Sequence, residues 1–263
     1  MRIPLFAVLL TLSACSQPGS EASRSTTDLN IPTSSCEAAK NSVCAFFNAP
    51  LILLTNPIKL FLRKEVFYPT AKDLKFVDST HQEWIAPKGT LTDGASIPRM
   101  FIPIIGAPTS REFINAAAIH DAYCGAGNNK LPQYHADTWQ NVHRMFYDAL
   151  RVGGTSAKKA KVMYAAVYLG GPRWNGKTTT QVTKSRNAPA NFQMSTKSSL
   201  YPQRSRNGKS LTSQGVSISQ LRNELQNTID FIQTENPSIA ELEYHLIKRE
   251  AVLVRQVELD DED

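Results

Sequence analysis

The residues best suited to chemistry in this chain are His120 and Asp121, followed by Tyr123 and, on a later segment, by Asp137. A histidine beside one carboxylate, with a second carboxylate further along the chain, can provide a base, an orienting group and a metal ligand. Those are the parts of a hydrolytic site. The alternative interpretation is a buried His120 held by Asp137 as part of the structure, without catalysis.

Helical spacing decides which of these side chains can meet. On a helix, His120, Tyr123 and Cys124 share a face because they are three and four residues apart. Asp121 projects about 100° away from His120, and Asp137 can reach the site only by tertiary packing. Cys124 is expected to be a buried free thiol rather than a nucleophile.

Further histidines flank Asp137 and broaden the choice of metal ligands. A zinc site of His120, Asp121 and His135 is conceivable, although its spacing matches no metalloprotease motif. His143 lies six residues from Asp137, off its face, and is expected to be solvated. Asp93 precedes Gly94 and can be read either as an Asx-turn or as a metal ligand.

The spacing of apolar residues changes along the chain, and it predicts the strands and helices that must position these residues. Three β-type runs, at 66–68, 74–77 and 84–86, predict a small antiparallel sheet. Three helices are expected next, from Thr109 to about Cys124, from Gln133 to Arg151, and from 155 or 156 to Leu169. The fold class predicted is α+β: a small antiparallel sheet followed by a helical core.

The last segment returns to helical periodicity, with a break at Pro237, and predicts a C-terminal helical hairpin or short coiled coil. Between Asp148 and Glu224 there is no acidic residue, whereas Lys and Arg recur throughout. The predicted organisation is a signal peptide (1–14), a tether (15–45), an α+β domain (46–174), a basic polar linker (175–215) and a helical hairpin with an acidic tail (216–263).

The N-terminus indicates export. One positive charge precedes an apolar run that is too short to span a bilayer. Leu12-Ser13-Ala14-Cys15 resembles a bacterial lipobox, which implies cleavage before Cys15 and lipidation of that cysteine. Ser16 follows it, which favours the outer membrane over the inner one. In an exported protein Cys36 and Cys44 are expected to form a disulfide, although a bond from either to Cys124 is open.

The charge pattern suggests partners. A basic segment on a membrane-tethered protein can lie on anionic lipid headgroups or bind an envelope protein. Nucleic acid is not expected, since no nucleic-acid-binding motif accompanies the charge. The plainer interpretation is that the basic and acidic blocks neutralise each other or aid solubility.

Residues 64–174 resemble the bacterial and phage family known as domain of unknown function 1353. The matching motifs are Thr92–Pro98, Ala118–Tyr123, Ala136–Trp139 and Met163–Val167. The resemblance implies a domain and a candidate site, and no particular reaction.

The sequence His-Asp-x-Tyr at 120–123, with an Asp on the next helix, is also similar to the core of phospholipases A2. That similarity implies His120 as general base, Asp137 as its orienting group and Asp121 as a Ca²⁺ ligand, with Asp93 as a second candidate ligand. The glycine-rich calcium loop and the multiple disulfides of those enzymes are missing in their usual form.

Two functions therefore remain open at the level of sequence. The first is a non-enzymatic, lipid-anchored interaction protein of the bacterial cell envelope. The second is a His120/Asp137 hydrolase that acts on phospholipid or another ester.

Overall fold

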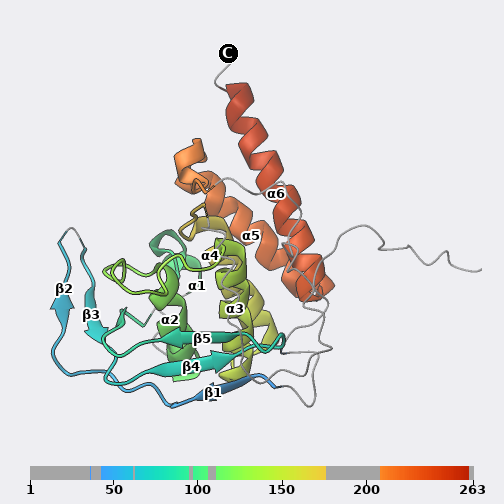
Figure 1. Cartoon of the computed structure of the whole chain (residues 1–263). Helices are drawn as coiled ribbons and strands as arrows, with labels where there is room; N and C mark the ends of the chain where they lie inside the picture. Colours follow the sequence, from blue (N-terminus) through green and yellow to red (C-terminus); the bar gives the residue numbers. More distant parts are fainter. Residues whose placement is uncertain are drawn as a thin grey trace, which may run out of the picture.

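The computed structural model describes residues 36, 43–61, 63–94, 97–105, 111–175 and 208–260. The predicted signal peptide, Cys15, most of the tether and most of the basic linker lie outside these residues. Among them, two small sheets are followed by a layered set of helices, as Figure 1 shows, which confirms the α+β prediction.

The strands form two antiparallel, three-stranded sheets. The first has the order β1-β4-β5, and its strands are β1 (Ala45–Phe47), β4 (Leu74–Val77) and β5 (Glu83–Ala86). The second has the order β2-β3-β6, with β2 (Ile58–Lys59), β3 (Val66–Pro69) and β6 (Leu91–Thr92). The run at 66–68 therefore belongs to a different sheet from the runs at 74–77 and 84–86.

The turn between β4 and β5 is organised by Asp78. Its carboxylate accepts hydrogen bonds from the backbone N–H groups of Thr80 and Gln82 and from Nε1 of Trp84, at 2.8–3.0 Å. A short polar side chain that binds the following backbone is a turn-forming device. Here it also satisfies the indole N–H of a Trp84 side chain that is 2% exposed.

Three helices follow the sheets: α2 (Arg111–Cys124), α3 (Trp139–Val152) and α4 (Ala157–Gly170). Thr138 and Ser156 cap the second and third, each accepting a backbone N–H three residues on. The helix expected from Gln133 begins only at Trp139, because residues 133–137 form turns in which His135 has a φ of 57°. Before α2, residues Arg99–Phe101 (η1) and Ile102–Ile105 (α1) form short helical turns.

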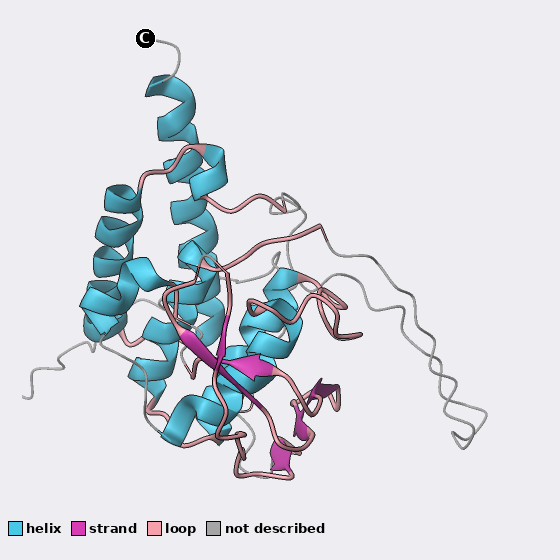
Figure 2. Cartoon of the chain, turned by 90° about the vertical axis from the view of Figure 1, so that its left-hand side faces the viewer, coloured by secondary structure: helices cyan, strands magenta, loops and turns pink. Residues whose placement is uncertain are grey.

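The layers pack in the order of the chain. Helix α2 packs against β4, β5 and β6 on one side and against α3 on the other, and α4 packs on α3. In Figure 2 the strands lie in the lower half of the molecule, and the C-terminal helices extend upward away from them. Large aromatic side chains that are at most 2% exposed fill the interior: Phe76, Trp84, Phe101, Trp139, Phe146, Tyr147 and Tyr164.

The C-terminal hairpin consists of α5 (Ile218–Glu235) and α6 (Ile239–Asp260), preceded by the turn η3 (Thr212–Gln214). Ser217 and Gln220 form a reciprocal capping box at the start of α5, and Asn236 ends it in the left-handed conformation. Both helices pack against α4, and their apolar residues belong to the same core as those of α2–α4. No helix in the described part of the chain is long and apolar enough to cross a membrane.

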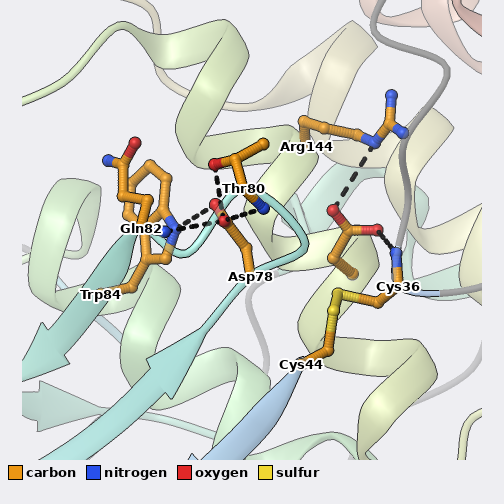
Figure 3. The surroundings of a disulfide bond; sticks show 8 residues. Cys36, Cys44, Asp78, Thr80, Gln82, Trp84 and Arg144 are labelled. Carbon is orange, nitrogen blue, oxygen red and sulfur yellow. Dashed lines mark hydrogen bonds and ion pairs between the residues drawn. A yellow bond between two sulfur atoms is a disulfide. The ribbon is translucent and has the colours of Figure 1, made fainter. Parts of the chain in front are cut away.

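A disulfide joins Cys36 and Cys44, the pair for which the sequence favours a bond, whereas Cys124 is a buried free thiol. Figure 3 shows the disulfide beside the α3 side chain of Arg144. The backbone N–H of Cys36 donates to the carboxylate of Asp148, also on α3, at 3.2 Å. Cys36 is thereby attached to the helical core, and the disulfide links Cys44 to it.

Candidate functional site

The structure brings together His120, Cys124 and His143 in a buried cluster between α2 and α3. Nε2 of His120 lies 2.9 Å from Nδ1 of His143, and Sγ of Cys124 lies 3.4 Å from Nε2 of His120. One potential ligand atom from each of the three residues lies within 4.8 Å of the other two. The side chains are 3%, 8% and 0% exposed, so the cluster is sealed from solvent.

Helical geometry accounts for the cluster. His120 and Cys124 are four residues apart on α2 and therefore lie one above the other on the same face. His143 comes from the face of α3 that also carries Trp139 and Phe146. The His143 ring centroid lies 5.5 Å from Trp139, and the ring of His120 lies 4.9 Å from Phe146. Packing of α2 on α3 then closes the gap between the two imidazoles.

Burial keeps the cluster uncharged. Desolvation lowers the pKa of His120 from 6.5 to about 3, and it lowers the pKa of His143 well below 6.5, with further repulsion from His120 and Arg173. Burial and the neighbouring Asp121 carboxylate raise the pKa of the Cys124 thiol well above its ordinary value. At neutral pH, in the absence of a cation, the cluster is thus two neutral imidazoles and a thiol.

The expected hydrogen bond between His120 and Asp137 is absent from the described residues. Asp137 instead accepts hydrogen bonds from Nε2 of Gln82, Nδ2 of Asn141 and the backbone N–H of Thr138, at 2.7–2.9 Å. The physical reason is the position of Asp137 immediately before the N-cap Thr138, which turns its carboxylate toward the first turn of α3 and toward the sheet. His143 occupies the place that the sequence suggested for the carboxylate.

Asp121 and Asp93, the two expected calcium ligands, do not belong to any cluster of three or more potential ligands among the described residues. Asp121 is buried on α2, with an exposed fraction of 8%. Asp93 is half-buried in the turn after β6, where the N–H of Gly94 donates to Oγ1 of Thr92.

Tyr123 and His135 have packing roles. Tyr123 lies edge-on to Trp84, and its hydroxyl accepts a hydrogen bond from the N–H of Ile85 at 3.3 Å. Burial raises the pKa of Tyr123 to about 12. His135 is stacked between Tyr134 and Trp174, with ring centroids 4.0 and 4.2 Å apart. A zinc site that includes His135 and Asp121 is therefore not formed.

The residue that the sequence interpretation misplaced is His143, which is fully buried rather than solvated. The signal was available: His143 lies four residues after Trp139 and three before Phe146, on the apolar face of its helix. Its spacing from Asp137 was uninformative because Asp137 lies outside that helix.

Residues 69–167 match the family described as "Protein of unknown function (DUF1353)". Two relatives from Sinorhizobium fredii also match. "Uncharacterized protein y4iH" is 42% identical over 102 residues, which is 39% of either chain. "Uncharacterized protein y4jT" is 37% identical over 111 residues, which is 42% of this chain and 31% of that protein.

The matched region thus covers less than two fifths of each relative's own length. The family match over residues 69–167 includes α2, α3 and most of α4, and therefore all three residues of the His120–Cys124–His143 cluster. No solved structure matches this chain.

Proposed function

We propose that this protein is a non-enzymatic component of the bacterial cell envelope, anchored by lipid on Cys15 and held against an anionic membrane surface by the hairpin of β2 and β3. The observation that carries the proposal is the apolar and basic surface of that hairpin. Figure 1 shows the hairpin projecting from the rest of the molecule.

The hairpin exposes large apolar side chains. Phe61, in the connection between β2 and β3, is 91% exposed, and Ile58 and Val66 beside it are 40% and 42% exposed. The preceding residues Ile52 and Leu54 are 49% and 44% exposed. A group of exposed apolar side chains of this kind is typical of a binding surface, and an aromatic residue at its tip suits a membrane interface.

The charges around this apolar surface are positive. Lys59, Arg63 and Lys64 are exposed, and residues 43–64 contain no acidic residue. Glu65, which follows them, forms an ion pair with Arg99. Each basic residue near an anionic membrane contributes roughly 1 kcal/mol of attraction. The basic residues of the 175–215 segment would add to this attraction.

The position of the hairpin in the chain fits a membrane-proximal role. It follows the predicted lipidation site by only a few tens of residues, so a lipid on Cys15 would hold this part of the domain near the bilayer. A single weak interfacial contact becomes effective when a covalent lipid supplies a second attachment.

The hydrolase suggested by the similarity to phospholipases A2 receives less support. A general base must reach the proton that it removes, whereas His120 is 3% exposed and makes its hydrogen bond to a second imidazole. The described residues also place no carboxylate on His120. Catalysis would require an opening of the α2–α3 interface.

The test uses residues 16–263, which lack both the apolar signal segment and the lipidated cysteine, so that the hairpin and the basic segment remain as membrane contacts. We expect this protein to sediment with phosphatidylglycerol vesicles, less with phosphatidylcholine vesicles, and less as salt increases. Phe61→Ser should weaken binding by about tenfold or more, since burial of a phenylalanine is worth roughly 1.5–3 kcal/mol.

Leu259→Ser is the matched control, because Leu259 is 55% exposed at the far end of α6. Equal loss in both variants, or equal binding to neutral and anionic vesicles, would contradict the proposal. Release of fatty acid from the vesicles that disappears in His120→Ala would favour the hydrolase instead.

A further inference from the structure

We propose that His120, Cys124 and His143 form a binding site for a single transition-metal ion of the zinc class. The site is separate from the β2–β3 hairpin, and neither proposal depends on the other. It differs from the calcium site that the sequence suggested both in its residues and in its chemistry.

Two of the three separations between the ligand atoms are close to those of a tetrahedral site. With Zn–N bonds near 2.0–2.1 Å and a Zn–S bond near 2.3 Å, tetrahedral angles place two nitrogens about 3.3 Å apart and sulfur and nitrogen about 3.6 Å apart. The observed separations are 2.9 Å for the two nitrogens and 3.4 Å for sulfur and Nε2 of His120. The third separation, between Sγ of Cys124 and His143, is within 4.8 Å, so these two side chains would close on the entering ion.

The donor set selects the kind of metal. Two imidazoles and a thiol suit zinc and related borderline ions, whereas calcium requires six to eight oxygen ligands. Both imidazoles are buried, and their facing ring nitrogens lie 2.9 Å apart, so an ion between them would be shielded from solvent. Cys124 would bind as the thiolate and release its proton to solvent when the ion enters.

The charge of a bound ion would be largely balanced within the site. A dication with one thiolate and two neutral imidazoles carries one net positive charge. Asp121 is buried on α2, three residues before Cys124. With the ion in place, the same carboxylate would offset the remaining positive charge.

The surroundings of His143 also fit a ligand role. Gly171 lies beside its second nitrogen, so that a Cβ at that position would stand 3.1 Å from Nε2. This nitrogen is buried and has no hydrogen-bond partner among the described residues. The other ring nitrogen, Nδ1, faces His120 and is the atom that would hold the ion. Three protein ligands leave a fourth position for a water or another small ligand.

The experiment treats the full-length protein with a chelator and titrates it with Co²⁺, and then with Zn²⁺ in competition. We expect one Co²⁺ per chain, a thiolate-to-cobalt charge-transfer absorption and the visible bands of a four-coordinate ion, all removed by Zn²⁺. A wild-type protein that shows no charge-transfer absorption would overturn the proposal, whatever the variants do.

The variants identify the ligands. Cys124→Ser should abolish the charge-transfer absorption, and His143→Gln should weaken Co²⁺ binding by about 100-fold or more, since loss of an outer-shell partner alone costs about 10–100-fold. The matched control is His245→Gln, because His245 stacks on Phe231 between α5 and α6, outside the cluster. Charge-transfer absorption that persists in Cys124→Ser, or equal weakening in His245→Gln, would contradict the assignment.

Discussion

Two consecutive residues of α3 serve two different kinds of buried polar site. His143 faces α2 and joins the uncharged cluster with His120 and Cys124, whereas Arg144 faces α6 and pairs with Glu243 at 2.7 Å. Glu243 also accepts a hydrogen bond from the hydroxyl of Tyr164 and is 1% exposed. Arg173 makes a similar pair with Glu250 of α6.

The difference between the two sites lies in the available countercharge. Arg144 meets a carboxylate from another helix, so each of these buried groups has a partner of opposite charge. His120 and His143 meet only each other and a thiol, so desolvation dominates and both are neutral. The Arg144–Glu243 pair binds α6 to the core. The His120–Cys124–His143 cluster instead leaves unprotonated nitrogen atoms that can accept a cation.

The largest effect is expected at the charged site. Arg144→Met should lower the free energy of unfolding by about 3–5 kcal/mol, because Glu243 then stays buried without its main countercharge. Urea denaturation of the chelator-treated protein measures this loss. The double variant Arg144→Met/Glu243→Met should recover most of it, since a matched apolar pair is often as stable as the ion pair. If the double variant is as unstable as Arg144→Met, the loss of stability comes from the missing attraction between the two side chains. It then does not come from leaving the Glu243 carboxylate buried without a partner.

The uncharged cluster should make stability sensitive to acid. The pKa of His120 is lowered from 6.5 to about 3 and that of His143 is lowered too, so below about pH 6.5 the unfolded chain binds protons that the folded chain excludes. Their contribution is complete above pH 6.5 and is lost as the pH falls. Asp148 acts in the opposite sense, because burial raises its pKa from 3.8 to about 7 and its contribution is lost as the pH rises through that range.

Burial also lowers the pKa values of His135 and His245, so below pH 6.5 the unfolded chain binds more protons than the folded chain even after the opposing effect of Asp148. Each excess proton corresponds to about 1.4 kcal/mol per pH unit, so the free energy of unfolding should fall by about that amount or more for each pH unit below 6.5. Urea denaturation of the metal-free protein at several pH values checks this. Stability that is constant or increases over this interval would mean that the two imidazoles are not buried in the neutral form.

A smaller effect is expected when the cluster loses one member but keeps its packing. His143→Phe preserves a ring against Trp139 and removes the hydrogen bond to His120. It should cost about 1–3 kcal/mol in the metal-free protein, the penalty of an unsatisfied buried polar group. Thermal denaturation with and without Zn²⁺ adds a second readout, because the variant should lose any stabilisation that Zn²⁺ gives the wild type.

The smallest effect is expected for an ion pair at the surface, which provides the reference for the buried ones. Lys75 and Glu83 are 2.8 Å apart across β4 and β5, with side chains 30% and 56% exposed. Lys75→Met should change the free energy of unfolding by about 0–1 kcal/mol. If Lys75→Met lowers the free energy of unfolding as much as Arg144→Met, buried ion pairs do not matter more than exposed ones for the stability of this protein.

Periodicity predicted the helices well, because each buries an apolar face. The run of Leu221, Leu225, Ile229 and Ile232, ended before Pro237, matches α5, and Ser156 caps α4 as expected. The short strands Ala45–Phe47 and Ile58–Lys59 were missed, since two or three residues carry no measurable alternation. Their pairing depends on distant partners: Ala45 pairs with Val77, 32 positions away, and Ile58 pairs with Phe67, 9 positions away. Local sequence does not encode these partners.

The site was predictable only in part, for a related reason. The shared face of His120 and Cys124 follows from spacing on one helix, whereas the identity of their partner depends on how α2 and α3 pack. Asp137 was the chemically attractive partner, but its position before the N-cap Thr138 directs it elsewhere. Helix boundaries are the least certain part of sequence interpretation, and here a shift of a few residues decided which side chain reached His120.

The ion pairs that α6 makes with Arg144 and Arg173 have a consequence for the order in which the chain acquires its structure. A polypeptide emerges from the ribosome with its N-terminus first, so Glu243 and Glu250 become available only after α3, α4 and α5 have been synthesised. Until then, α3 and α4 lack both these carboxylates and the apolar cover of α5 and α6. We therefore expect a nascent chain to remain incompletely folded until α6 has emerged, and truncation before α6 to yield a species prone to aggregation.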